Sequence, residues 1–141
     1  MPALFEYRHT VLASEIDDLG HVNNLAYLRW MQSAAIAHST ARGWSGLAYR
    51  ELGSGFVVRR HEIEYRQPAF VHEEIVVRTW VADMRKMTSL RRYEIVRPAD
   101  AVLLAVAETN WAFIDLATGR LSRIPVEVSS AFELIADPPD G

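Results

Sequence analysis

The chain has 141 residues, of which 50% are hydrophobic, and a formal net charge of −3. This length is enough for one domain with a core, so we predict a single domain over residues 1–136 and a disordered tail, Asp137–Gly141. The acidic balance argues against nucleic acid as a partner, because phosphate binding needs clustered Lys and Arg.

The composition also excludes several kinds of chemistry and location. The chain contains no cysteine, which excludes disulfides, zinc–thiolate sites and a cysteine nucleophile. Its longest apolar runs, such as residues 101–107, are far shorter than the ~20 residues of a membrane helix. The first residues, Met1–Glu6, lack a basic segment followed by an apolar one. We therefore predict a cytoplasmic protein with no membrane segment.

The first part of the chain predicts a strand, a polar loop and a long helix. Residues 4–12 are rich in Phe, Tyr, Thr and Val, which favours a strand. From Leu25 to Gly43 the period is helical, and one or two further helical turns are expected over residues 44–52. The residues at helical spacing are Tyr27, Leu28, Met31, Ala34, Ala35 and His38. One face of this helix is therefore expected to pack against the rest of the fold.

The second part of the chain predicts antiparallel strands joined by short turns. The predicted strands cover residues 60–66, 74–83, 89–97 and 101–115, with a short last strand at 120–123. The 101–115 strand is apolar on both faces, which favours a place in the interior of the sheet. Pro125 suits the start of a closing helix that ends near Ile135. This order predicts an α+β fold in which a long helix is wrapped by a curled antiparallel sheet of five or six strands.

The candidate active-site loop is the stretch Asp17-Asp18-Leu19-Gly20-His21-Val22-Asn23-Asn24. It brings two carboxylates, an imidazole and two amides to the point where the long helix begins. A helix amino terminus has unpaired N–H groups and a partial positive charge, which can polarise a carbonyl while a nearby carboxylate attacks it. The ordinary alternative is that these residues form Asx turns and helix caps.

This loop, the strand-then-proline segment Ile63–Pro68 and the late turn Asp115–Pro125 resemble the hotdog-fold thioesterase superfamily. The similarity covers nearly the whole chain and is greatest to the branch of 4-hydroxybenzoyl-CoA thioesterases and small bacterial acyl-CoA thioesterases. The resemblance implies a homodimer, often paired into a homotetramer, with two active sites built across the subunit interface. It also implies an acyl-CoA or acyl carrier protein thioester as substrate, with no cofactor.

The resemblance assigns catalytic roles to Asp17 and Asn24, and His21 is a third catalytic candidate from the loop itself. Asp17 matches the family's catalytic carboxylate, and Asn24 matches the position whose backbone N–H polarises the thioester carbonyl. His21 stands where the hydroxybenzoyl branch has an apolar residue. It could orient the acyl group or a water, carry a proton, or be purely structural. The sequence His-Val-Asn-Asn also resembles the corresponding motif of plant acyl-carrier-protein thioesterases. Those enzymes, however, have an Asn where this chain has Leu19.

Other residues are candidates for contact with the substrate. Arg85, Lys86 and Arg123 fall where the related enzymes hold the phosphates of coenzyme A. Elsewhere, basic strand residues such as Arg91 and Arg92 are expected to be solvated. The remaining candidates are Gly20, Asn23 and Tyr27, each of which also has an ordinary role as a turn, cap or core residue.

The predicted function is hydrolysis of an acyl or aroyl thioester to a free acid and coenzyme A. Asp17 could add to the carbonyl or deprotonate a water, and the sequence leaves both routes open. Two other functions also stay open: a non-catalytic acyl-CoA-binding protein, and an enoyl-thioester hydratase that pairs Asp17 with His21. No metal site is expected, because neither His61–Glu62 nor His72–Glu74 has metal-ligand spacing.

Overall fold

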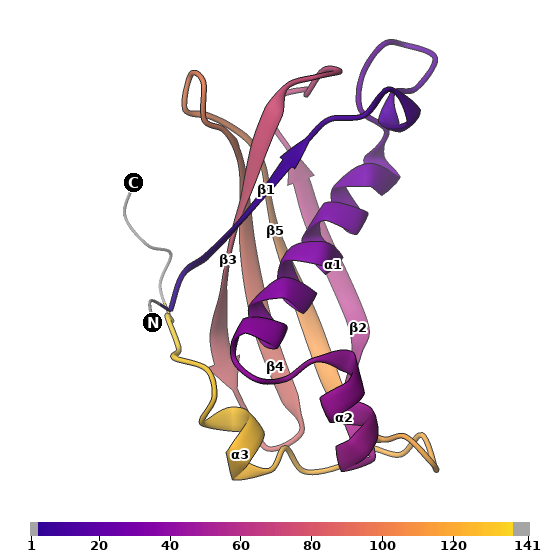
Figure 1. Ribbon diagram of the computed structural model, residues 1–141, viewed down its shortest axis with the longest axis vertical. Coiled ribbons are helices and arrows are strands. Elements are labelled where there is room, and N and C mark those ends of the chain that lie inside the picture. The colour runs from indigo at the N-terminus through magenta and orange to yellow at the C-terminus, as the bar shows by residue number, and fades with distance from the viewer. Residues whose placement is uncertain (1–2, 137–141) are drawn as a thin grey trace.

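The computed structural model describes residues 3–136, so the predicted tail Asp137–Gly141 lies outside the described residues. Strand β1 (Phe5–Thr10) leads through the short helix η1 (Ala13–Glu15) to α1 (Asn24–Ala41) and α2 (Gly46–Leu52). The strands β2 (Ser54–Tyr65), β3 (Glu74–Met84), β4 (Thr88–Arg97) and β5 (Val102–Asp115) follow, and α3 (Val126–Ser129) comes last. Figure 1 shows α1 lying along one face of the sheet. Within the described residues, no helix is long and apolar enough to cross a membrane.

The five strands form one antiparallel sheet in the order β1-β3-β4-β5-β2. Strand β5 therefore lies between β4 and β2, which confirms its predicted interior place. The pairing register shifts at Val58/Arg60, Val81/Asp83 and Ile95/Val96. Such bulges bend a strand and increase its twist, so the sheet curls around the helix. The α+β layout expected from the sequence is confirmed, with five strands.

The buried face of α1 supplies the centre of the core. Its small residues Ala34 and Ala35 allow the helix to approach the sheet closely, while Trp30 and Met31 fill the space beside them. The buried residues of this helix are Ala26, Tyr27, Trp30, Met31, Ala34, Ala35 and His38. This set repeats the helical spacing that the sequence predicts, so the packing of α1 follows directly from its apolar pattern.

The last part of the chain differs from the prediction. Instead of a strand at residues 120–123, the structure has a single bridge between Leu121 and Ile114. The predicted closing helix is only the four-residue α3, and the chain beyond it is held by a hydrogen bond from the Ile135 N–H to the Val81 carbonyl at 2.9 Å. Contacts with the sheet decide the path of this segment, because its local helical and strand preferences are weak.

Arg91 is also placed differently from the expectation of a solvated strand residue, since only 6% of it is exposed. Its Nη1 donates to Nδ1 of His38 at 2.9 Å and to Oγ1 of Thr79 at 3.1 Å. The His38 ring also stacks on Phe5, with ring centroids 5.1 Å apart. Burial, together with the positive charges of Arg91 and Arg42, lowers the pKa of His38 to about 3. His38 is therefore neutral at neutral pH and accepts a hydrogen bond from Arg91.

The lowered pKa of His38 predicts that acid destabilises the protein well above the range in which carboxylates titrate. Below its ordinary pKa of 6.5, His38 gains a proton in the unfolded chain, whereas in the folded chain it stays neutral down to about 3. The stability that it contributes is present above pH 6.5 and is lost as the pH falls. Between pH 7 and pH 5 we expect the free energy of unfolding to fall by ~2 kcal/mol from this residue alone.

Urea denaturation at both pH values measures this loss. The variant His38→Gln keeps an acceptor for Arg91 but does not titrate, so the difference between the two pH dependences isolates His38. Equal pH dependence in both proteins would contradict the prediction.

Candidate active site

The loop between η1 and α1 folds back on itself and so places Asp17 beside the start of the helix. Ile16 pairs with Val22 as an isolated antiparallel bridge. Inside this bridge the Asp17 N–H donates to the His21 carbonyl at 2.7 Å, and the Gly20 N–H donates to the Asp17 carbonyl at 3.1 Å. Gly20 has φ +82°, a backbone conformation that residues with a Cβ rarely adopt. Local backbone hydrogen bonds and the positive φ of Gly20 therefore shape the turn of this loop.

The carboxylate of Asp17 is exposed and is held by its own loop. Its Oδ1 accepts hydrogen bonds from the N–H groups of Leu19 at 2.9 Å and His21 at 3.2 Å. This is the Asx-turn geometry that the sequence offers as the ordinary role of an aspartate before a helix. Both hydrogen bonds end on the same oxygen, so the turn fixes the carboxylate and leaves Oδ2 outside these two contacts.

The helix start supplies the second part of the site. Asn23 is the N-cap of α1, and its Oδ1 accepts from the Ala26 N–H at 3.0 Å. Within residues 3–136, the N–H of Asn24 has no hydrogen-bond acceptor. Together with the positive end of the helix dipole, this N–H can polarise an oxygen that comes within hydrogen-bond distance of it. Asp17 and Asn24 are thus brought to the same end of the same helix.

The capping role of Asn23 leads to a stability prediction. We expect Asn23→Ala to lower the free energy of unfolding by ~1 kcal/mol, because the Ala26 N–H loses its side-chain acceptor. Thermal or urea unfolding measures the effect. Asn24→Ala is the matched control, since the contribution of Asn24 to the helix start comes from its backbone, and we expect it to change stability by less than ~0.5 kcal/mol. Equal losses in both variants would show that the cap hydrogen bond is not the cause.

Glu15 supports the loop from below, and no sequence motif singles it out. Only 8% of this residue is exposed. Its Oε1 accepts from Nε2 of His9 and from the Leu12 N–H, and its Oε2 accepts from Nε1 of Trp30, all at 2.8 Å. Burial acts to raise the pKa of Glu15, but the three hydrogen bonds and the positive charge of His9 outweigh it, so the pKa lies below its ordinary value.

Glu15 also ties the loop to the helix through its backbone. Its carbonyl accepts from the N–H of Asn23 at 2.8 Å. The carboxylate therefore joins β1, the residue before η1 and α1, while the carbonyl holds the cap residue at the end of the loop. The sequence signal is weak, because a single glutamate near Ala13 and Ile16 does not show that its donors come from three separate elements.

His21 and Tyr27 occupy different environments. His21 is exposed, and its ring lies edge-on to Phe70 with centroids 5.5 Å apart. Tyr27 is only 3% exposed and packs against Trp30 and Tyr65, with ring centroids 4.9 and 5.0 Å away. Burial raises the pKa of Tyr27. The structure therefore places His21 on the open side of the loop and Tyr27 in the core beneath it.

The predicted basic residues lie at the other end of α1. Arg85 and Lys86 form the exposed tip of the β3–β4 hairpin, where Nε of Arg85 lies 3.4 Å from Oδ2 of Asp83. The Ile124 N–H donates to the Lys86 carbonyl at 2.7 Å, which brings exposed Arg123 to the same tip. Figure 1 shows this hairpin and the loop at opposite ends of the fold, separated by the helix, which is ~27 Å long for its 18 residues. One chain therefore does not bring Arg85, Lys86 or Arg123 to Asp17.

Among residues 3–136 there is no group of three His, Cys, Asp or Glu side chains that could hold a metal ion. Of the histidines that the sequence singled out, His61 instead contacts Oγ1 of Thr109 through Nδ1 at 2.8 Å. The chemistry available at the loop is that of a carboxylate and backbone N–H groups.

A long helix wrapped by a curled five-stranded antiparallel sheet, with a carboxylate at the helix start, defines a hotdog-fold protein. The chain belongs to the thioesterase-like superfamily, whose family model matches residues 11–132. Both the family and the fold expected from the sequence are thereby confirmed.

Solved structures of similar fold come from several bacteria. A 1,4-dihydroxy-2-naphthoyl-CoA thioesterase from Synechocystis has a TM-score of 0.84 and 21% identity, over 91% of this chain and 94% of that one. A hypothetical protein from Thermus thermophilus has a TM-score of 0.84 and 26% identity, over 91% and 96%. A hypothetical protein from Staphylococcus aureus, solved in complex with CoA, has a TM-score of 0.86 and 17% identity, over 96% and 89%. The likenesses at 17% and 21% identity show the fold alone.

Proposed function

We propose that this protein is an acyl-CoA thioesterase that hydrolyses an acyl or aroyl thioester to a free acid and coenzyme A. The observation that supports it is the carboxylate of Asp17, fixed by two N–H groups in an exposed loop at the start of α1, where the N–H of Asn24 has no acceptor within the described residues. Membership of the thioesterase-like superfamily adds to this support.

The chemistry requires little beyond these two groups. A thiolate is a good leaving group, because a thiol has a pKa of ~8.5, so no strong general acid is needed. The N–H of Asn24 stabilises the developing oxyanion, and one well-placed donor of this kind contributes ~3 kcal/mol. Asp17 either adds to the carbonyl carbon, expelling the thiolate and leaving a mixed anhydride that water cleaves, or removes a proton from the attacking water. Both routes give the same acid and the same thiol.

The coenzyme A part of the substrate needs a second copy of the chain in this proposal. Arg85, Lys86 and Arg123 are too far from Asp17 within one chain to hold the phosphates of the same substrate. A homodimer in which the basic end of one subunit lies beside the loop of the other removes this difficulty. We propose this arrangement for the substrate site.

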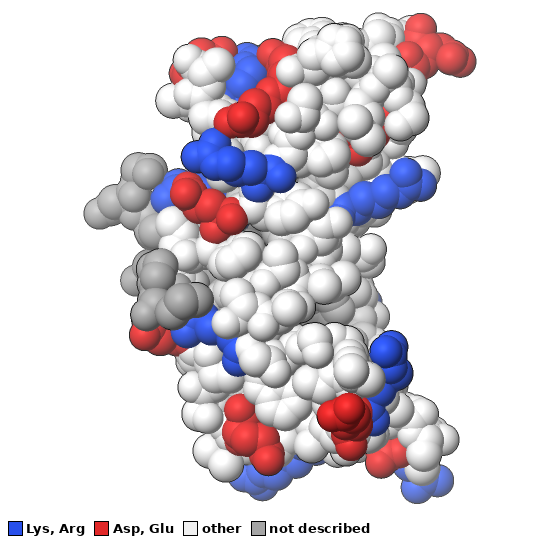
Figure 2. All heavy atoms as spheres, in the orientation of Figure 1, with Lys and Arg blue, Asp and Glu red and all other residues white. Residues whose placement is uncertain are grey.

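Three features of the chain support such a dimer. Strand β2 is an edge strand, which leaves one side of its backbone open to pairing. Leu25 lies on the outward side of α1 and is 65% exposed. Figure 2 shows that the middle of this face is largely free of charged side chains. An uncharged face of this kind with exposed apolar residues is typical of a surface that another subunit covers.

A thiol-release assay over short, medium, long and aromatic acyl thioesters tests the proposed function. Steady release of free thiol from at least one class of thioester is the expected result. The rival function is that of a non-catalytic acyl-CoA-binding protein, and the observation that favours it is the Asx turn, which gives Asp17 a structural role without catalysis. Tight acyl-CoA binding with no thiol release over hours would favour this rival.

A further inference from the structure

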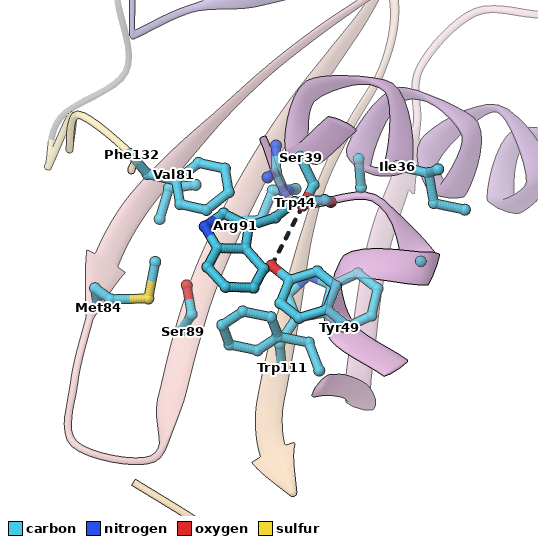
Figure 3. A pocket seen from close by; sticks show the side chains of 13 residues that line it. Ile36, Ser39, Trp44, Tyr49, Val81, Met84, Ser89, Arg91, Trp111 and Phe132 are labelled. Atoms are coloured by element: carbon cyan, nitrogen blue, oxygen red, sulfur yellow. Dashed lines mark hydrogen bonds between the residues drawn. The ribbon is translucent and has the colours of Figure 1, made fainter. Parts of the chain in front are cut away.

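A cavity of about 220 Å³ lies between the end of α1, the short helix α2 and the sheet. It is separate from the Asp17 loop, because its lining includes Ile36 and Ser39 from the second half of α1 and none of residues 17–24. Aromatic rings form much of its wall, and Figure 3 shows those of Trp44, Tyr49, Trp111 and Phe132 around the same space. A cavity of ~150 Å³ can hold benzene, so this one has room for a larger ring compound or a medium-length chain.

Arg91 supplies a cation to this apolar space. It lines the cavity and is only 6% exposed, whereas Ile36, which also lines the cavity, is 63% exposed. The cation is therefore at the inner end, and Ile36 marks the side that is open to solvent. Burial lowers the pKa of Arg91, but a guanidinium keeps its proton in proteins. A ligand that enters past Ile36 meets aromatic walls first and a positive charge last.

The contacts of Arg91 leave its charge without a counter-charge. Its two hydrogen bonds go to neutral acceptors, His38 and Thr79, and both leave from Nη1. Within residues 3–136, Arg91 forms no ion pair with an Asp or Glu. A buried charge that lacks a counter-charge is costly, so an anion at Nε or Nη2 would stabilise the folded protein.

The two serine hydroxyls of the cavity are already bonded within the protein. Oγ of Ser39 donates to the Trp44 carbonyl at 2.7 Å, and Oγ of Ser89 donates to the Asp83 carbonyl at 2.9 Å. Arg91 is thus the group in this wall whose chemistry selects a ligand. A guanidinium binds a carboxylate through paired N–H donors, and the aromatic wall favours an apolar body.

We propose that this cavity binds a free organic carboxylate with an apolar body of one or two rings, or of similar size, and that its carboxylate pairs with Arg91. The aromatic rings contact the apolar part, and the remaining donors of the guanidinium bind the charged end. The proposal does not depend on thioester hydrolysis, because its readout is equilibrium binding to the protein as it stands.

Calorimetric titration with 2-naphthoate, benzoate and octanoate tests the proposal, and 2-naphthamide serves as the uncharged analogue. We expect at least one of the three carboxylates to bind, and 2-naphthoate to bind at least ~10-fold more tightly than its amide, as a charge-assisted hydrogen bond gives. Trp44 and Trp111 line the cavity, so tryptophan fluorescence provides a second readout at the site itself. Equal affinity for acid and amide, or no binding of any carboxylate, would overturn the proposal.

Two variants test whether the carboxylate binds at Arg91. Arg91→Met keeps the length and apolar stem of the side chain and removes the charge, so we expect the preference for the acid over the amide to disappear. Arg92→Met is the matched control, because Arg92 follows on the opposite face of β4 and does not line this cavity. We expect it to bind 2-naphthoate as the unaltered protein does. If Arg91→Met binds the acid normally, the assignment is wrong. The acid–amide comparison on the unaltered protein tests it even if that variant does not fold.

Discussion

Replacing Asp17 with asparagine should lower kcat for thioester hydrolysis by ~10²- to 10³-fold while leaving the fold intact. The carboxylate is the proposed nucleophile or general base, and an amide can take neither role. The loop should survive, because the side-chain oxygen of asparagine can still accept the N–H groups of Leu19 and His21 that Oδ1 of Asp17 accepts. The change thus removes the charge and keeps the turn. Initial rates of thiol release, with circular dichroism to verify the fold, measure the effect.

The neighbouring carboxylate gives the control for this experiment. Asp18 is exposed in the same loop, and it has no assigned role in the reaction. We expect Asp18→Asn to keep the rate of the unaltered protein to within a few-fold. Unchanged turnover in a folded Asp17→Asn protein would contradict the proposed mechanism. It would leave Asp17 with only its part in the Asx turn, whereas equal losses in both variants would point to a general effect of loop charge.

The parts of the fold that were predictable from the sequence are those with a long repeating pattern. Helix α1 is one, because the residues of its buried face recur at helical spacing over many turns. Strand β5 is another, since its long apolar run favours a place with a paired strand at each edge, between β4 and β2. The segment over residues 120–135 was not predictable, because its few local signals are overridden by contacts such as that of Ile135 with Val81.

The residues of the candidate site also differ in how far the sequence predicts them. Asp17 and Asn24 lie close in the sequence, so the residues of the loop are enough to predict that both lie at one helix start. Glu15 and Arg91 were not predictable in their roles, because the groups that surround them come from separate elements. A buried arginine and a solvated one look alike in an alternating strand until the helix that covers one face is known. Sequence alone therefore finds the loop and misses both buried charged residues.

Glu15→Ala should lower the free energy of unfolding by ~3 kcal/mol at pH 7, a large effect for one residue. The change leaves three donors in a buried region without their acceptor, namely Nε2 of His9, the Leu12 N–H and Nε1 of Trp30. Removing one partner of a buried polar group is far more harmful than removing both. Urea unfolding at pH 7 measures the loss. Glu62→Ala is the matched control, because the ion pair that Glu62 forms with Arg60 is exposed, and we expect a change in the free energy of unfolding below ~1 kcal/mol.

The pH dependence separates the charge of Glu15 from its packing. Burial acts to raise its pKa, but the hydrogen bonds from its three donors lower it below the ordinary value of 4.5. A carboxyl with a lowered pKa in the folded state contributes stability above its ordinary pKa and loses it as the pH falls through the folded value. The difference in the free energy of unfolding between the unaltered protein and Glu15→Ala should therefore be largest near pH 7 and should decrease below pH ~4.5. If this difference stays constant with pH, the side chain stabilises the loop by filling space, and its charge has no part in holding the helix start in place.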